Sequence, residues 1–210
     1  MRDMTGCEIK EYLLKKGRRA IVFDTVGSTN AYVKENPQEA GTVVLALSQS
    51  SGHGQYGRVF ESPESGLYMS FCTRFILGFP MTLAAANAVT DALCELFGLS
   101  LGVKWVNDII ASGKKLCGIL AESVFCGEKS FTVIGIGMNL KKGGLSPEIE
   151  DVAISLEEIT ATELPSDVIA LLAFEISKNL EKELSGKKED VIKKYRARCI
   201  SNIPENAVFI

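Results

Sequence analysis

Short apolar stretches separated by turns dominate the first two thirds of the chain. Residues 20–23 and 42–47 are predicted strands, because Ile, Val and other apolar residues fill them. Between them, the polar cluster 28–30 predicts the start of a short helix, and Pro37 predicts its end. Residues 67–75 alternate between apolar and polar positions, which predicts a strand with one buried face.

Helical spacing takes over in longer segments. Residues 80–97 carry apolar side chains at intervals of three and four, and Gly98 follows as a helix stop. A second such pattern, with Ser166 as its predicted cap, precedes a basic amphipathic segment at 187–199.

Further strands are predicted on both sides of the Ser112–Gly113 turn and at 131–137. The whole pattern predicts an α+β fold, with a mixed central β-sheet flanked by helices.

Composition narrows the class of protein. The 210 residues carry a net charge of −3, so no global positive field attracts nucleic acid, and no apolar run is long enough to span a membrane. The six cysteines lack C-x-x-C spacing, and one histidine cannot complete a metal site with them. We therefore predict reduced thiols in a cytoplasmic protein, with Cys72, Cys94 and Cys117 in its core.

Residues 52–57 read GHGQYG, a match to the G-x-G-x-x-G dinucleotide fingerprint. The context excludes that interpretation, because no strand directly precedes the glycines and proline and glycine follow where a helix should open. One alternative is a flexible surface loop with no role. The side chains of Gln49, His53, Gln55 and Arg58 favour instead a loop that closes over a small ligand with a carboxylate or phosphate.

Three other stretches offer candidate chemistry. GSTN (27–30) clusters hydroxyl and amide groups, although helix capping alone would explain it. VKWVND (103–108) places Lys104 beside the only tryptophan, either at a sheet edge or pointing into a pocket. Gly135 and Gly137 alternate in a predicted strand, so they bare one face for close approach of another group.

Taken in order, GSTN, SQSSGHGQYGR, KWVND, KKLCGILAE and GIGMN resemble the motifs of the biotin protein ligase family over roughly residues 24–140. The resemblance implies a class II synthetase-like biotin ligase catalytic domain that uses ATP with Mg²⁺. It implies activation of biotin to biotinyl-5′-AMP and transfer to a lysine of a biotin carboxyl carrier protein. The resemblance does not indicate which residues would bind Mg²⁺.

The resemblance also implies residue roles. Lys104 would be the catalytic cation where the biotin carboxylate meets the α-phosphate. Biotin-binding roles fall on Ser28, Thr29, Asn30, Gln49, Gly52, His53, Gly54, Gln55, Lys104, Gly135 and Gly137. Nucleotide-binding roles fall on Arg58, Phe60 and Asn139. His53 and Gln55 stand where the family usually has arginines, so we expect weaker retention of the adenylate.

The resemblance places the catalytic domain at residues 1–200 and the start of a missing or truncated C-terminal β-barrel domain at 201–210. It leaves no room for an N-terminal winged helix, which disfavours a repressor role. Two alternatives remain: a biotin- or adenylate-binding module without efficient transfer, and a relative of the lipoate or octanoate transferases. An edge strand could also pair two copies in a homodimer.

Overall fold

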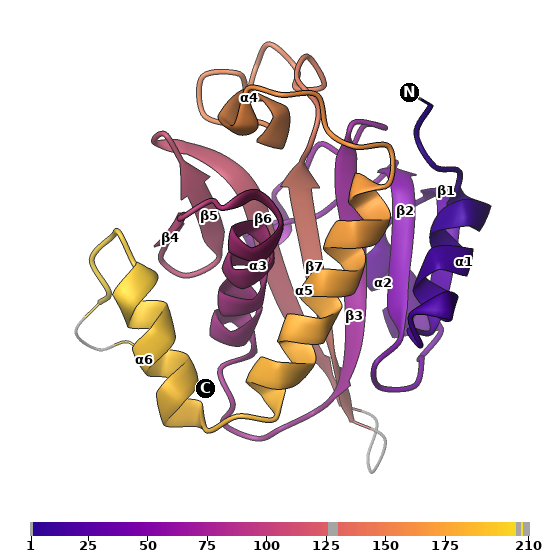
Figure 1. The fold of residues 1–210 in the computed structure, drawn as a ribbon. Helices are drawn as coiled ribbons and strands as arrows, with labels where there is room; N and C mark the ends of the chain where they lie inside the picture. Colours follow the sequence, from indigo (N-terminus) through magenta and orange to yellow (C-terminus); the bar gives the residue numbers. More distant parts are fainter. Residues whose placement is uncertain (1, 126–129, 205–206, 208–210) are drawn as a thin grey trace.

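A seven-stranded mixed sheet organises the residues that the computed structural model describes, namely 2–125, 130–204 and 207 (Figure 1). The strand order is β1-β2-β3-β7-β6-β5-β4, with β1 and β2 parallel and all other neighbours antiparallel. The strands are β1 (Ala20–Val26), β2 (Val43–Gln49), β3 (Gly66–Arg74), β4 (Gly102–Lys104), β5 (Asp108–Ala111), β6 (Lys114–Val124) and β7 (Phe131–Asn139). The predicted α+β fold with a mixed sheet is confirmed.

The main hydrophobic core lies between one face of the sheet and a layer of helices, with α3 and α5 packed side by side across the middle (Figure 1). The helices are α1 (Gly6–Lys15), α2 (Thr29–Glu35), α3 (Met81–Phe97), α4 (Leu156–Thr160), α5 (Val168–Leu184) and α6 (Lys188–Arg198). Leu67, Met69 and Phe71 of β3 point into this core and are almost completely buried. Burial of such side chains is the main source of stability for this layer.

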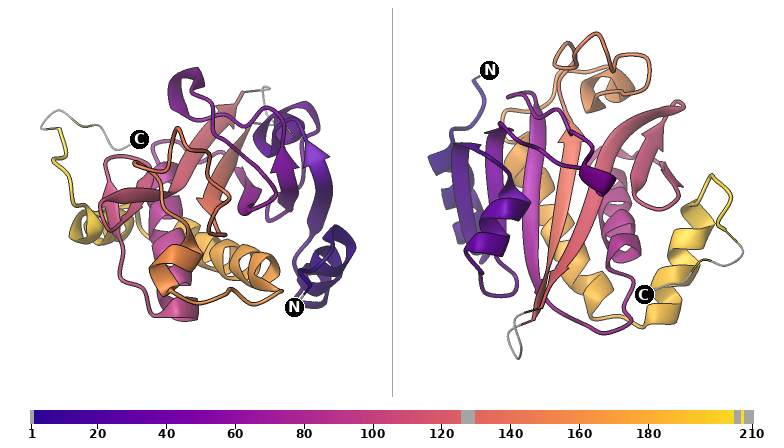
Figure 2. Two further views of the ribbon diagram at one scale, coloured as in Figure 1. Left: turned by 90° about the horizontal axis from the view of Figure 1, so that it is seen from above. Right: turned by 180° about the vertical axis from the view of Figure 1, so that it is seen from behind.

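The opposite face of the sheet is covered by α2 and by a loop that contains the single turn η1 (Gln55–Gly57), as the right view of Figure 2 shows. Helix α2 packs there on a small apolar cluster that includes Val33, Val44 and Cys72. Because both faces are covered, β3 is buried from Gly66 to Thr73. The prediction that residues 67–75 have one exposed face is therefore wrong.

Most predicted turns and helix ends are confirmed. Gly98 adopts φ 67° at the end of α3. Ser112 and Gly113 both have positive φ and join β5 to β6 as a tight hairpin. Helix α5, however, begins at Val168 with Asp167 at its N-cap, so Ser166 is not its cap.

Short helix α4 was not predicted, and it owes its start to a reciprocal capping box between Ser155 and Glu158. The structure describes five cysteines, all free thiols. Cys72 and Cys117 are buried as predicted, and desolvation raises the pKa of the Cys72 thiol to about 12. Cys94 is exposed on α3, which contradicts the prediction, and Cys126 lies outside the described residues. Within the described ranges no helix is long and apolar enough to cross a membrane.

Candidate active site

Two rows of residues that include three glycines form the floor of a cavity on the face of the sheet that carries α2. In one row Gly118 of β6, Gly137 of β7 and Tyr68 of β3 are direct partners across the strands. In the next row Gly135 lies between Leu120 and Ser70. The predicted role of alternate glycines in baring one strand face therefore agrees with the register.

Side chains from elsewhere in the chain lie directly on these glycines. A Cβ on Gly137 would sit 2.6 Å from the Phe60 ring, and a Cβ on Gly135 would sit 2.5 Å from Oδ1 of Asn30. Real Cβ atoms do not approach other atoms so closely, so each glycine is required by its neighbour. The absence of side chains at Gly135 and Gly137 therefore allows Asn30 and Phe60 to pack directly on the sheet.

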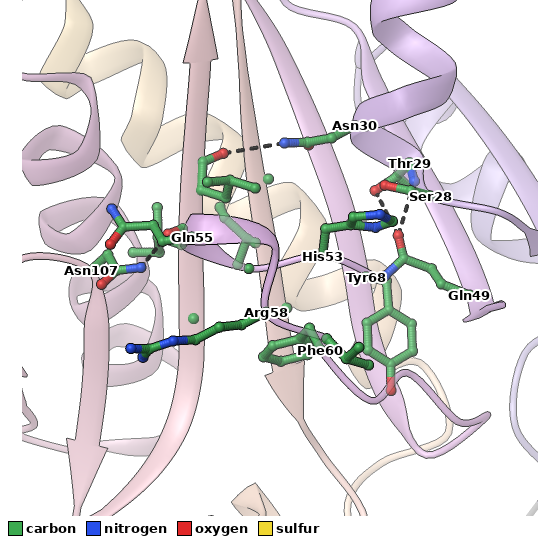
Figure 3. Close-up of a pocket in the computed structure, with 18 of the residues that line it drawn as sticks. Ser28, Thr29, Asn30, Gln49, His53, Gln55, Arg58, Phe60, Tyr68 and Asn107 are labelled. Carbon is green, nitrogen blue, oxygen red and sulfur yellow. Dashed lines mark hydrogen bonds between the residues drawn. The ribbon is translucent and has the colours of Figure 1, made fainter. Parts of the chain in front are cut away.

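A network of hydroxyl and amide groups lines one end of the cavity, at the start of α2. Gln49 Oε1 accepts hydrogen bonds from the Thr29 backbone N–H at 2.9 Å and from Thr29 Oγ1 at 3.2 Å. The Ser70 hydroxyl, completely buried, donates toward Thr29 Oγ1 at 2.8 Å and Asn30 Oδ1 at 2.6 Å. Ser28 caps α2 as predicted. These groups are neutral and held in fixed orientations by one another (Figure 3).

An ion pair fixes the orientation of the Asn30 amide. Its Nδ2 donates to Glu122 Oε2 at 2.8 Å and to the Leu120 carbonyl at 3.3 Å. Lys34 holds the other oxygen of Glu122 at 2.8 Å. Because the carboxylate can only accept, Asn30 must turn its N–H groups toward β6 and its oxygen toward Ser70.

The glycine loop, residues 50–60, crosses above this floor. It closes on itself through an antiparallel bridge between His53 and Val59 and through a hydrogen bond from the Phe60 N–H to the Gly52 carbonyl at 3.0 Å. Gly52 packs so tightly on the Phe60 carbonyl and Ser62 hydroxyl that no larger residue fits. The base of the loop is therefore fixed, and the segment between His53 and Val59 reaches out over the cavity.

Phe60 and Tyr68 form an aromatic wall at the base of the loop. Their rings meet edge to face with centroids 6.5 Å apart. The Tyr68 hydroxyl donates to the Pro63 carbonyl at 2.7 Å, and burial raises the pKa of this phenol so that it stays a donor. Lys115 Nζ lies 5.8 Å from the Phe60 ring centroid.

Charged groups gather at the other end of the cavity. Lys115 Nζ pairs with Asp108 Oδ1 at 2.6 Å, and Asn107 donates from Nδ2 to the Ile119 carbonyl at 2.8 Å. Figure 3 shows Arg58 extending to this side, away from Thr29 and the groups around it. The cavity thus has a neutral hydrogen-bonding end and a cationic end.

Most of the predicted site residues lie in this cavity, which has a volume of about 170 Å³. Those that line it are Ser28, Thr29, Asn30, Gln49, His53, Gly54, Gln55, Arg58, Phe60, Gly135 and Gly137. Three predicted residues are not brought to its wall. Gly52 anchors the base of the loop, as described above. Asn139 is engaged with the backbone instead, since its Nδ2 donates to the carbonyls of Lys115 at 3.4 Å and Ile154 at 3.3 Å.

Lys104 is the third. Its side chain is exposed and does not line the cavity. Its backbone pairs with Asp108, and direct partners on antiparallel strands project to the same face of a sheet. Lys104 therefore lies on the cavity face, near the cationic end, but the lysine that reaches the cavity wall is Lys115.

Sequence reasoning missed Asn107, Asp108, Lys115 and Gly118 as lining residues. Asn107 and Asp108 belong to the KWVND stretch, in which only the lysine received a role. Gly118, the glycine of KKLCGILAE, could have been recognised from the sequence. Like the glycines of GIGMN, it interrupts an apolar strand pattern, which indicates that another group approaches the backbone closely.

Known proteins resemble this chain in sequence and in fold. The family model described as "Biotin/lipoate A/B protein ligase family" matches residues 22–139. The bifunctional ligase/repressor BirA of Bacillus subtilis is 34% identical over 153 residues, which are 68% of this chain and 47% of that protein. The biotin–[acetyl-CoA-carboxylase] ligase of Mycobacterium tuberculosis is 31% identical over 156 residues, covering 68% of this chain and 56% of that protein. The chain thus spans about half the length of these curated relatives.

Similarity extends to solved structures. The biotin protein ligase from Aquifex aeolicus in complex with biotin and ATP superposes with a TM-score of 0.75 at 30% identity, covering 87% of this chain and 78% of that chain. Residues 22–139, the segment that the family model matches, contain the glycine loop and both rows of the cavity floor. The chain belongs to the biotin/lipoate A/B protein ligase family.

Proposed function

We propose that the protein is an ATP-dependent biotin–protein ligase. It activates biotin to biotinyl-5′-AMP and then transfers the biotinyl group to a lysine of a biotin carboxyl carrier domain. Family membership supports this proposal, as does the similarity to an Aquifex aeolicus enzyme whose structure holds biotin and ATP.

The different chemistry of the two ends of the cavity supports this function. Thr29, Asn30 and Gln49 offer fixed neutral donors and acceptors at one end, which suit the uncharged ureido group of biotin. Arg58 and Lys115 offer cations at the other end, which suit the biotin carboxylate and the phosphates of ATP. A ligand that is neutral at one end and anionic at the other fits this cavity in one direction only.

The proposed first step brings two anions together. A carboxylate oxygen of biotin attacks the α-phosphorus of ATP, and the bond from that phosphorus to the pyrophosphate oxygen breaks. Fixed cations lower the barrier because they stabilise the negative charge shared by both groups. Lys115 already stands in the cavity, and we keep Lys104 as a proposed second cation that can reach in from the same face of the sheet.

Mg²⁺ is proposed as the ion that accompanies ATP. An ion of this kind usually needs only one or two protein carboxylates beside the phosphates. Asp108 is the carboxylate among the lining residues, so the donor set fits such an ion, which would supply further charge neutralisation at the phosphates.

Transfer to the carrier completes the proposed reaction. The amine of the acceptor lysine attacks the acyl carbon of the adenylate, and AMP leaves. Until then the glycine loop shields the mixed anhydride from water, a role supported by its position above the floor. Phe60 is the proposed aromatic neighbour of the nucleotide. Asn139 is proposed to act on the nucleotide indirectly, because its amide holds the backbone carbonyl of Lys115.

Exchange of labelled pyrophosphate into ATP tests this function. The protein should catalyse exchange only when biotin is present, and its complete absence would contradict the proposal. We expect Lys115→Met to slow exchange about a hundredfold, the cost typical of removing one group that stabilises transition-state charge. Lys104→Met tests the second cation, and unchanged exchange would remove it from that role. Lys10→Met on α1, with an exposed side chain, is the matched control.

A further inference from the structure

The segment that follows α6 lies along the outer edge of the sheet. Cys199 forms a parallel bridge with Val103 of β4, and the Ile200 N–H donates to the Val103 carbonyl at 3.0 Å. The Ile200 side chain lies over Gly102, where a Cβ would come within 2.5 Å of its Cγ2. The edge of β4 is therefore covered by a segment distant in sequence.

Two side chains from this region hold the turn between β4 and β5. Ser201 Oγ accepts a hydrogen bond from the Trp105 backbone N–H at 2.7 Å. The Tyr195 hydroxyl donates to the Val106 carbonyl at 3.1 Å, and its ring meets the Trp105 ring edge to face with centroids 6.0 Å apart. Tyr195 is completely buried, and burial raises the pKa of its phenol, so this donor keeps its proton.

The same turn continues directly into the cationic end of the cavity. Asn107 exchanges two hydrogen bonds with Ile119 of β6, at 2.8 Å and 2.9 Å. Asp108, the next residue, lines the cavity and pairs with Lys115. A shift of the turn would therefore move the groups proposed to meet the carboxylate and phosphates.

We propose that Tyr195 and Ser201 are positioning residues for adenylate formation. They act from outside the cavity by clamping the backbone of Trp105 and Val106, which sets the position of Asn107 and Asp108. This inference rests on the proposed function. It assigns a role in the reaction to α6 and to the described residues after it, none of which lines the cavity.

Two conservative variants test the clamp. Tyr195→Phe removes only the hydroxyl that reaches Val106, and Ser201→Ala removes only the acceptor for Trp105. Tyr12→Phe on α1 and Ser185→Ala after α5 remove the same groups at positions that do not line the cavity. We expect each clamp variant to lower the maximal rate of biotin-dependent pyrophosphate exchange about tenfold, because misplacement by a fraction of an ångström is costly in catalysis.

The KM for biotin should stay within about twofold, since the clamped residues Trp105 and Val106 are not among the groups of the neutral end. A role in stability alone would lower the amount of folded protein and leave the rate per folded molecule unchanged. The double variant Tyr195→Phe, Ser201→Ala should be little slower than either single variant, because both side chains hold one turn.

The only tryptophan of the chain gives a readout that does not depend on activity. In both clamp variants acrylamide should quench Trp105 fluorescence more strongly than in the unmodified protein, while the two control variants should show no change. Unchanged quenching in both clamp variants, or unchanged exchange per folded molecule, would overturn the clamp. Failure of the unmodified protein to exchange would instead overturn the proposed function, and the quenching would still decide whether the turn is clamped.

Discussion

Replacement of Gly135 by alanine tests the close approach of Asn30 to the sheet. The new Cβ would lie 2.5 Å from Asn30 Oδ1 and 2.8 Å from its Nδ2. Non-bonded atoms settle at about 3.5 Å or more, so the amide would have to retreat by about 1 Å. That movement would stretch its hydrogen bonds with Ser70, Glu122 and Leu120, which now measure 2.6 Å, 2.8 Å and 3.3 Å.

The size of the effect follows from these bonds. A neutral hydrogen bond contributes about 1 kcal/mol net, and one to a charged group about 1.5–3 kcal/mol. Loss of the bond to Glu122 and weakening of the bond with Ser70 should cost about 3 kcal/mol. Alanine in place of glycine returns about 0.4–1 kcal/mol through the unfolded chain. We therefore expect Gly135→Ala to lower the free energy of unfolding by about 2 kcal/mol.

Urea unfolding measures this change, and calorimetry with biotin measures its effect on the site. Biotin affinity should fall at least tenfold, because Asn30 and its neighbours form the neutral end of the cavity. Gly27→Ala is the matched control, since no atom lies within 4 Å of the position its Cβ would take. Because it meets no clash, it should raise the free energy of unfolding by about 0.4–1 kcal/mol through the unfolded chain alone.

A double variant separates the clash from other effects. In an Asn30→Ala background the methyl group at position 135 has room, so adding Gly135→Ala there should cost less than about 0.5 kcal/mol. The same cost with and without the Asn30 side chain would refute the reasoning. So would a Gly135→Ala protein that unfolds and binds biotin like the unmodified one.

Three further outcomes are expected. Burial by itself would raise the pKa of Asp91, but the hydrogen bonds and positive charges of Lys194 and Arg198 together hold that pKa below its ordinary 3.8. The contribution of Asp91 to docking α6 is therefore complete above pH 3.8 and is lost as the pH falls through the lowered pKa, so urea midpoints at pH 2–6 should show an acid loss that Asp91→Asn reduces. His53→Arg should slow the release of biotinyl-5′-AMP in rapid-filtration assays, because it adds a permanent cation to the loop, and equal rates would contradict this. Tyr68→Phe should lower the free energy of unfolding by about 1 kcal/mol through loss of its bond to Pro63, as measured by urea unfolding.

Features that depend on local chemistry were predictable from the sequence. Helix α3 and its end at Gly98 follow from apolar spacing and from the freedom of glycine to adopt positive φ. The hairpin at Ser112–Gly113 has the same local origin. The alternation of Gly135 and Gly137 correctly indicated a bare strand face, because strand periodicity needs no information from distant residues.

Lys115 could not be found in this way, because a β-bulge reverses the alternation. Gly118 and Leu120 face the cavity, so strict alternation along β6 would point Lys115 into the core beside Cys117. The register shifts between Ile109 and Ile110 of β5, and Leu116 and Cys117 then both lie in the core. The extra residue turns Lys115 to the cavity face. Bulges arise from pairing with another strand, which one sequence pattern does not reveal.

Long-range packing explains the remaining differences. The second face of β3 is buried because α2 and the glycine loop lie over it, and its own alternation carries no trace of that cover. Asn139 is the last residue of the cavity strand β7, yet its amide donates to the carbonyl of Ile154, just before α4. The placement of Lys104 near but outside the cavity depends on the short edge strand β4, which is held at Val103 by Cys199 and Ile200 from a distant part of the sequence.

Mass spectrometry of the ligand bound to the intact protein tests the central claim most directly. After incubation with ATP, Mg²⁺ and biotin, followed by rapid removal of free ligand, the protein should carry an added mass equal to that of biotinyl-5′-AMP. Omission of ATP should leave only biotin bound. A protein that carries no ligand, or that holds biotin and ATP without joining them, would contradict the account.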